Sequence, residues 1–374
     1  MAMRIGHVLA FVSLLAVPTQ AQDMDHPHSH GRTITFPDVE GYHTLKVDLH
    51  MHTVFSDGKV WPNIRVEEAL KDGLDAIAIT EHLEYQPHRA DIPHPDRNRA
   101  FDIAQEAAGD RGLLVIRGSE ITRSMAPGHA NAIFLEDANP LLKDDVEDAY
   151  TAARAQGAFI FWNHPAWLAQ APDGVPPLSP LHRNLIETDR LHGIEVVNMY
   201  DFSAEALQIA LDYNLTILGT SDIHGLIDWD FDIPGGGHRP ITMVFTEERT
   251  EASLKEALFE GRTAVWFNDM LIGREQHILP LLEATLEVIK FEYVGREKVA
   301  RVTIANHSDA ELIVRNQSSF SLHRHGDIIQ LAPHAHTEIQ VMTLDVLDSF
   351  ALPLEVLSAT IAPNRHPTIT LRVE

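Results

Sequence analysis

Val47-Asp48-Leu49-His50-Met51-His52-Thr53-Val54-Phe55-Ser56-Asp57-Gly58 is the stretch that decides the fold. It begins inside a short apolar run, 45–49, that predicts a β-strand, and it continues into a pair of histidines. Side chains two residues apart on an extended chain point the same way, so His50 and His52 can share one metal ion. His-x-His recurs in this chain of 23 histidines, but only this pair ends an apolar strand. The stretch therefore predicts a metal site at the carboxyl end of a buried strand.

Six more apolar runs follow at 76–80, 113–117, 130–135, 158–162, 194–198 and 215–219. Helical stretches separate them, such as 63–71, which has Pro62 at its start and Gly73 just past its end. Apolar strands that alternate with helices predict a parallel sheet covered on both faces, and so many in succession predict an α/β barrel. In such barrels the residues that perform chemistry lie at the carboxyl ends of the strands.

Histidines and carboxylates stand at most of these predicted strand ends. They are Glu81 and His82, Glu120, His129, His164, and Asp222 with His224. A single buried histidine is most often structural, but here independent accidents at many strand ends would have to coincide. We therefore expect these side chains to converge on one rim of the barrel.

The pattern changes after Gly273. The runs 300–304, 338–341 and 368–373 alternate polar with apolar residues and no good helix separates them, which predicts an antiparallel β-sandwich. We expect a catalytic barrel over 42–275 and an all-β sandwich domain over 276–374.

The N-terminus has the features of a signal peptide over 1–21. Arg4 supplies a positive charge, 8–17 is nearly all apolar, and Thr19-Gln20-Ala21 offers small residues before a cleavage point. The segment 22–41 contains spaced histidines and is expected to be a flexible lead-in. No later apolar run approaches the length of a membrane span. We therefore expect an exported protein, periplasmic or secreted, without membrane insertion.

Composition limits both the partners and the metal ligands. The chain has 29 basic and 54 acidic residues, a formal net charge of −25, so nucleic-acid duplexes and anionic membrane surfaces are repelled. It contains no cysteine, so a metal site must use imidazole and carboxylate groups. Nothing in the sequence indicates an oligomeric state.

The motifs of this chain resemble a known family. The stretch 47–58, followed by Thr80-Glu81-His82, Gly118-Ser119-Glu120 and Ser221-Asp222-Ile223-His224, is similar to the polymerase and histidinol phosphatase (PHP) family of metal-dependent phosphoesterases. The resemblance covers about 42–273 and implies a distorted seven-stranded (β/α) barrel with up to three metal ions. With its signal peptide and sandwich, the chain is most similar to exported phosphodiesterases of that family, including a type that acts on organophosphate diesters.

The resemblance also implies three groups of metal ligands. The first metal would be held by His50, His52, Glu120 and Asp222; the second, bridged by Glu120, by His129 and His164; and the third by Asp57, His82 and His224. The implied cofactors are two to three divalent ions, manganese first, with zinc or iron as alternatives. Relatives usually carry Asp-His where this chain has Glu81-His82, so Glu81 is interpreted as a residue that orients an imidazole.

Charge counting favours hydrolysis of an anionic ester. Three carboxylates (Asp57, Glu120 and Asp222) facing three divalent ions leave a charge of about +3, which attracts a small anionic phosphoester. Paired metals make hydroxide available near neutral pH and clamp phosphoryl oxygens. We therefore expect metal-dependent hydrolysis of phosphate diesters by a metal-activated hydroxide, with Glu120 and Asp222 at the catalytic centre.

Other roles follow from position alone. Glu81 or His238 is a candidate acid for the leaving group, and Arg123 and Arg239 are candidates for binding a phosphate oxygen. Few cationic residues lie near the predicted rim, which favours a diester over a dianionic monoester.

Three alternatives stay open. The first is a phosphomonoesterase that uses the same metals. The second is a metal-dependent amidohydrolase, although those enzymes commonly bridge metals with a carboxylated lysine where this chain has Glu120. The third is a noncatalytic metal-binding or carbohydrate-binding protein.

Overall fold

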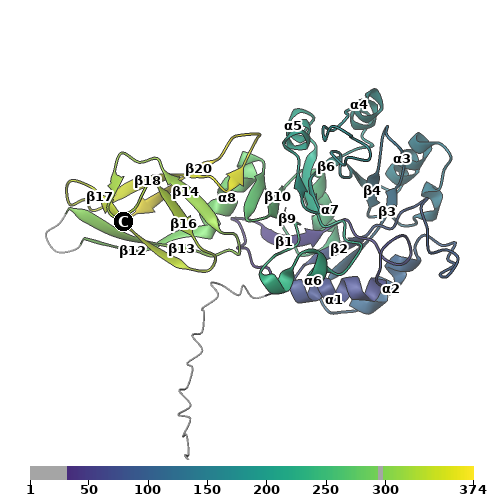
Figure 1. Cartoon of the computed structure of the whole chain (residues 1–374), viewed down its shortest axis with the longest axis horizontal. Coiled ribbons are helices and arrows are strands. Elements are labelled where there is room, and N and C mark those ends of the chain that lie inside the picture. The colour runs from purple at the N-terminus through teal and green to yellow at the C-terminus, as the bar shows by residue number, and fades with distance from the viewer. Residues whose placement is uncertain (1–31, 294–297) are drawn as a thin grey trace, which may run out of the picture.

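A helix-covered barrel and an all-β sandwich lie side by side in the molecule (Figure 1). The computed structural model describes residues 32–293 and 298–374. The predicted signal peptide and the histidines of the predicted lead-in lie outside the described residues. None of the helices within these ranges has the length and hydropathy of a membrane span.

Seven barrel strands occupy the positions of the seven apolar runs, as predicted. They are β1 (His43–Asp48), β2 (Ala76–Ile79), β3 (Leu114–Ile121), β4 (Ala130–Ile133), β5 (Phe159–Trp162), β6 (Gly193–Asn198) and β8 (Thr216–Thr220). The helices around them are α1 (Pro62–Asp72), α2 (Arg99–Ala108), α3 (Val146–Ala155), α4 (Pro180–Glu187), α5 (Ala204–Asp212), α6 (Ile227–Asp230) and α7 (Glu251–Phe259). Two 3₁₀ turns, η1 (Asn139–Leu141) and η2 (Ile233–Gly235), and the two-residue strand β7 (Asp201–Phe202) lie in the loops. Helix α1 begins at Pro62 and is capped at its carboxyl end by Gly73, whose φ of +68° suits glycine.

The barrel sheet is mixed, so the prediction of a parallel sheet was wrong. Strands β1, β2 and β3 are parallel neighbours, but β4 runs antiparallel to both β3 and β5. Residues 122–129 join β3 to β4, and a connection this short cannot carry the chain back to begin a parallel strand. The start of β4 therefore lies at the same rim as the end of β3, which brings His129 beside Glu120.

Side chains close the barrel between β8 and the next strand along the chain, β9 (Ile241–Thr246). Strands β9, β10 (Thr263–Phe267) and β11 (Met270–Gly273) extend the sheet beyond β1 by antiparallel pairing. The Thr242 hydroxyl accepts from the Gly219 N–H at 2.9 Å and donates to the Gly219 carbonyl at 2.8 Å. Gly219 also permits the close packing of β10 against β8, because a Cβ there would lie 2.2 Å from Val265 Cγ1. Strand β8 thus joins β9 through side chains where no strand ladder is formed.

The C-terminal domain contains two four-stranded sheets, as the period-two pattern predicts. One sheet consists of β12 (Leu286–Tyr293), β13 (Val299–Asn306), β15 (Ser321–Leu322) and β17 (His336–Met342). The other consists of β14 (Leu312–Asn316), β16 (Ile328–Leu331), β18 (Phe350–Val356) and β20 (Thr368–Val373). Burial alternates along these strands, so one side of each sheet faces the domain core.

Helix α8 (Glu275–Thr285) joins the two domains and precedes the runs between which no helix was expected; the sequence analysis did not predict it. Ile278, Leu281 and Leu282 are buried at helical spacing, whereas the interior Pro280 obscures the pattern in the sequence. Strand β19 (Ala359–Thr360) pairs with β11, and one core cluster runs from the barrel edge into the sandwich. The domains therefore share a hydrophobic core.

Candidate metal centre

The nine residues predicted as metal ligands lie at one rim of the barrel. They are His50 and His52 after β1, Asp57 in the next loop, His82 after β2, Glu120 in β3, His129 before β4, His164 after β5, and Asp222 and His224 after β8. Each of these side chains approaches another member of the set through a ring nitrogen or a carboxylate oxygen. Three overlapping groups can be distinguished.

The first group surrounds Asp222. His50 Nε2 lies 3.1 Å from His52 Nε2, and Asp222 Oδ1 lies 3.2 and 3.1 Å from these two nitrogens. Glu120 approaches the same nitrogens at 3.6 and 3.8 Å. Ligand atoms that each lie about 2.1 Å from one ion are separated by about 3.0 to 3.5 Å. The spacing of these four buried side chains therefore suits one shared ion.

The second group surrounds the other side of Glu120. Its Oε1 lies 3.0 Å from His129 Nδ1 and 3.5 Å from His164 Nε2, and it accepts a hydrogen bond from Asn163 Nδ2 at 2.8 Å. Glu120 has no exposed surface. It therefore lies between the two groups, where a carboxylate that bridges two ions must lie.

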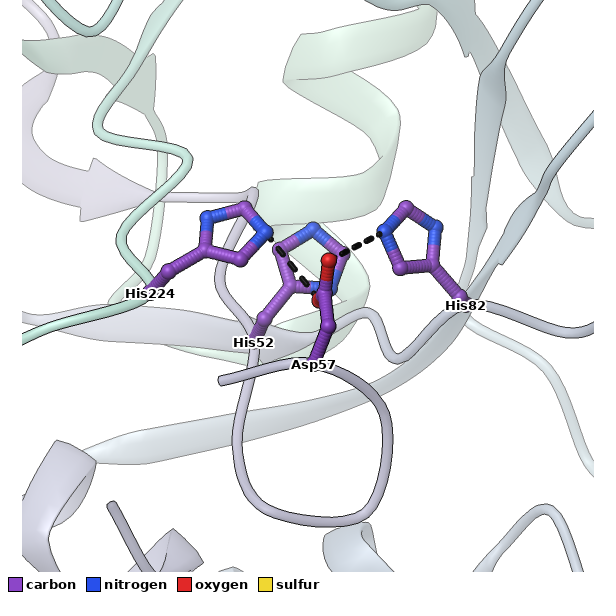
Figure 2. Close-up of side chains that lie close together, drawn as sticks. All are labelled: His52, Asp57, His82 and His224. Atoms are coloured by element: carbon purple, nitrogen blue, oxygen red, sulfur yellow. Dashed lines mark ion pairs between the residues drawn. The ribbon is translucent and has the colours of Figure 1, made fainter. Parts of the chain in front are cut away.

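The third group is on the outer side of His52 and is formed around Asp57. Figure 2 shows the Asp57 carboxylate between the rings of His82 and His224; the closest nitrogen–oxygen distances are 3.4 and 3.1 Å. The loop that carries Asp57 folds tightly over the strand end, because a Cβ at Gly58 would lie 2.6 Å from the backbone of His52. Glycine at this position thus allows Asp57 to reach the two histidines.

Three carboxylate oxygens indicate that the site fits cations. Asp57 Oδ1, Glu120 Oε2 and Asp222 Oδ1 are buried without a hydrogen bond of acceptable geometry among the described residues, although histidine nitrogens lie close to each. Buried carboxylate oxygens without donors are costly unless a cation neutralises them. Imidazole and carboxylate are ligands that divalent manganese, iron and zinc accept. The residues present therefore fit divalent metal ions.

The charges at the rim shift the pKa values of His50 and His52 in opposite directions. Burial alone lowers the pKa of His50, but Asp222 and Glu195 outweigh it and raise the pKa to about 10. Burial and the neighbouring His82 lower the pKa of His52 to about 3, so this ring stays neutral. A divalent ion at the first group must therefore displace a proton from His50 but not from His52.

Glu195 is a buried residue of the site that the sequence reasoning missed. Its Oε1 accepts hydrogen bonds from His50 Nδ1 at 2.8 Å and from the Thr220 hydroxyl at 2.6 Å. Its Oε2 accepts from the His164 N–H at 2.6 Å and from Asn198 Nδ2 at 2.9 Å. A proton held on His50 Nδ1 leaves Nε2 free for an ion. The available signal was one carboxylate in the middle of an otherwise apolar strand.

Glu81 acts on His52 through a hydroxyl. The Ser56 hydroxyl donates to Glu81 and lies 3.2 Å from His52 Nδ1, so it accepts the proton of that nitrogen. Burial raises the pKa of Glu81, and the backbone N–H of Thr53 also donates to it. This chain of contacts leaves His52 Nε2 unprotonated and facing the first group.

Two ligand candidates have a left-handed backbone. His164 has a φ of +28° and Asp222 a φ of +47°. Such conformations cost about 1–3 kcal/mol in residues other than glycine and persist where neighbours hold them. The Ser221 N–H and hydroxyl donate to Asp48 at 3.1 and 2.5 Å, and Glu195 holds the His164 N–H. The strain is therefore located at strand ends that present ligands to the rim.

Arg239 and His238 do not join the ligand groups. Arg239 is 1% exposed and pairs with Asp72 at 2.6 Å and Asp48 at 3.2 Å, so its guanidinium is not available to a phosphate. His238 stacks on Trp266 at 3.5 Å between ring centroids and lines a separate cavity of about 110 Å³. These placements correct the predicted substrate-binding and acid roles, which rested on sequence position alone.

Arg123 lies closer to the centre. It lines a recess of about 520 Å³ together with His129. Its Nε lies 2.8 Å from Glu84, and its guanidinium also donates to the backbone carbonyls of Lys143 and Asp144. Arg123 is therefore near the ligand groups but already has partners.

A barrel that gathers buried imidazoles and carboxylates into overlapping groups at the strand ends defines a metal-dependent enzyme of the (β/α)-barrel class. A PHP domain model matches residues 48–178, and an Ig-like domain model matches 286–372. A two-domain protein from Bacteroides vulgatus, described as containing a predicted PHP-like metal-dependent phosphoesterase, is 43% identical; the match covers 92% of this chain and 100% of that one, with a TM-score of 0.85. The chain belongs to the PHP family, and it is a PHP-like metal-dependent phosphoesterase.

Two further structures match only about half of the chain. One is a candidate metal-dependent phosphoesterase from Bifidobacterium adolescentis, 20% identical over 48% of this chain and 88% of its own, with a TM-score of 0.39. The other is an amidohydrolase from Chromobacterium violaceum, 16% identical over 48% of this chain and 87% of its own, with a TM-score of 0.36. A search of curated proteins finds no match.

Proposed function

We propose that the protein hydrolyses phosphate diesters with divalent ions held at the barrel rim. The observation that carries the proposal is a pair of cavities that both include Trp167. One is a cleft of about 520 Å³ that reaches His164 and Glu195, and the other is the recess of about 520 Å³ that reaches His129 and Arg123. Because each cavity reaches a different ligand candidate of the second group, a phosphoryl group at this rim has room for one ester substituent in each cavity, which a diester requires.

Sparse positive charge supports the choice of a diester. A monoester is dianionic near neutral pH and needs more cationic groups to capture it. Among the described residues that line the two cavities, Arg123 is the one guanidinium, no lysine is present, and Arg123 already pairs with Glu84. A monoanionic diester suits a site in which the metal ions carry most of the positive charge.

When bound, divalent ions in such a site supply hydroxide near neutral pH and neutralise phosphoryl oxygens. The residues of the chain prepare the site for them. Glu195 holds the proton on His50 Nδ1 and Ser56 accepts the proton on His52 Nδ1, so both Nε2 atoms face the first group. Glu120 lies between the first and second groups: its Oε1 approaches nitrogens of both groups, and its Oε2 approaches His52 of the first. We propose manganese as the native ion, with zinc or iron as alternatives of the same ligand chemistry.

Turnover of matched aryl esters tests the proposal. The protein is stripped with a chelator, reconstituted with manganese, zinc or iron, and assayed on p-nitrophenyl phosphate and bis(p-nitrophenyl) phosphate. We expect metal-dependent turnover with a kcat/KM for the diester at least about tenfold above that for the monoester. A preference for the monoester would replace the proposal with a phosphomonoesterase. No metal-dependent turnover of either ester would refute it.

A further inference from the structure

We propose that the cleft on the His164 side of Trp167 binds an apolar ester substituent of about the size of a phenyl ring. The inference rests on the proposed diester hydrolysis, because it names the kind of group that the substrate carries. It concerns the lining of the cleft, which the metal ligands do not determine.

Large apolar side chains are unusually exposed around this cleft. Trp167, Leu168 and Tyr200 all line it, and they are 48%, 66% and 53% exposed. Exposed apolar residues that stand singly are common, but three that line one cleft mark a binding surface. Met199 and Phe202 line the same cleft and extend this surface toward β7. The cleft therefore favours an apolar group, because binding removes the apolar surface of that group from water.

The walls of the cleft are held in place without a ligand. The Trp167 ring lies edge-on to His164, with 5.2 Å between centroids, and the backbone N–H of Trp167 donates to the His164 carbonyl. The Tyr200 hydroxyl donates to the Asp230 carbonyl at 2.7 Å, and its ring lies 5.4 Å from Phe231. Aromatic walls fixed in this way lose little conformational freedom when a flat group binds between them.

The cleft is continuous with the metal centre. His164 and Glu195 form part of its lining, as does Asn198, whose Nδ2 lies 3.3 Å from Asp222 Oδ2. A substituent on a phosphorus atom at the rim therefore extends directly into the cleft. The described lining residues include no lysine or arginine, so a substituent that carries a second phosphate finds no partner there.

Binding of two phosphonates separates the cleft from the chemistry. Phenylphosphonate and methylphosphonate have a C–P bond in place of the ester, so neither is hydrolysed, and calorimetric titration of the manganese-loaded protein gives both affinities. We expect phenylphosphonate to bind about tenfold more tightly. Leu168→Ser should reduce this preference to about threefold or less, because Leu168 lines the cleft and its apolar side chain is not a metal ligand. Leu344→Ser, at a comparably exposed leucine of the sandwich, should keep the wild-type preference.

The outcomes distinguish this inference from the proposed function. Equal affinities for the two phosphonates, or a Leu168→Ser variant with the full wild-type preference, would overturn the apolar cleft even if diesters are hydrolysed. If the protein prefers phenylphosphonate in a way that depends on Leu168 but hydrolyses no diester, the proposed binding cleft is supported and the proposed diester hydrolysis is refuted. Each result thus decides one of the two proposals.

Discussion

Glu195→Gln tests whether a buried carboxylate remote in sequence prepares the first metal site. Each oxygen of Glu195 accepts two hydrogen bonds: His50 Nδ1 and Thr220 donate to one, and the His164 N–H and Asn198 donate to the other. Glutamine keeps the shape of the side chain but replaces one acceptor oxygen with an NH₂ group that donates. One pair of donors must therefore lose its acceptor.

Either orientation of the amide harms the site. If its NH₂ faces His50, the ring must carry its proton on Nε2, the atom 3.2 Å from Asp222, and that atom can no longer bind an ion. If its NH₂ faces His164 and Asn198, both of those donors face a donor and lose their acceptor. The residue after β5, His164, then loses the hydrogen bond that holds its backbone. Loss of a group that orients a metal-bound histidine weakens metal affinity about 10- to 100-fold, or about 1.4–2.8 kcal/mol.

Competition titration against a chelator at constant pH measures this effect. We expect the tightest metal site of Glu195→Gln to weaken by that factor. Glu247→Gln, at an exposed carboxylate beyond β9, should bind as wild type does. Thermal unfolding of the metal-free proteins establishes that both variants fold. A folded Glu195→Gln variant with a dissociation constant within twofold of wild type would refute the reasoning.

Three other perturbations address the remaining groups. Glu120→Ala removes the carboxylate between the first and second groups, so kcat/KM should fall about 1000-fold or more. A variant that retains a tenth of the wild-type kcat/KM would exclude a bridging role for Glu120. Asp57→Asn replaces a carboxylate of the third group with a neutral amide, so elemental analysis after gel filtration should find about one metal equivalent fewer per chain. A metal content equal to that of the wild type would exclude Asp57 as a ligand. Burial lowers the pKa of His50 and of His82, but neighbouring carboxylates raise these pKa values to about 10 and about 11, so both rings are protonated at pH 7 without metal. An ion that displaces one such proton should bind about tenfold more tightly for each unit of pH between 6 and 9, and affinities that do not change with pH would contradict these protonation states.

Local sequence was sufficient to predict the strands and the ligand candidates at their ends. An apolar run ends where its buried strand ends, so the polar residues that follow, such as His50, His164 and Asp222, must lie at the sheet edge. The same reasoning predicted the sandwich, because alternation of polar and apolar residues is a property of each strand taken singly. It missed helix α8, whose periodicity Pro280 interrupts.

Only the tertiary structure decided what these side chains contact. The sequence showed a lone carboxylate at Glu195 within an apolar strand, but its partner His50 lies 145 residues away, and no local pattern records such a pairing. Sequence position made Arg239 a candidate for binding a phosphate oxygen, but the fold places Asp48 and Asp72 around its guanidinium. The direction of β4, and with it the place of His129, followed from pairing with β3 and β5. Periodicity in the sequence indicates which side of a helix or strand is buried. Which side chains contact one another on that side depends on distant segments of the chain, and those contacts form only when the whole sheet closes.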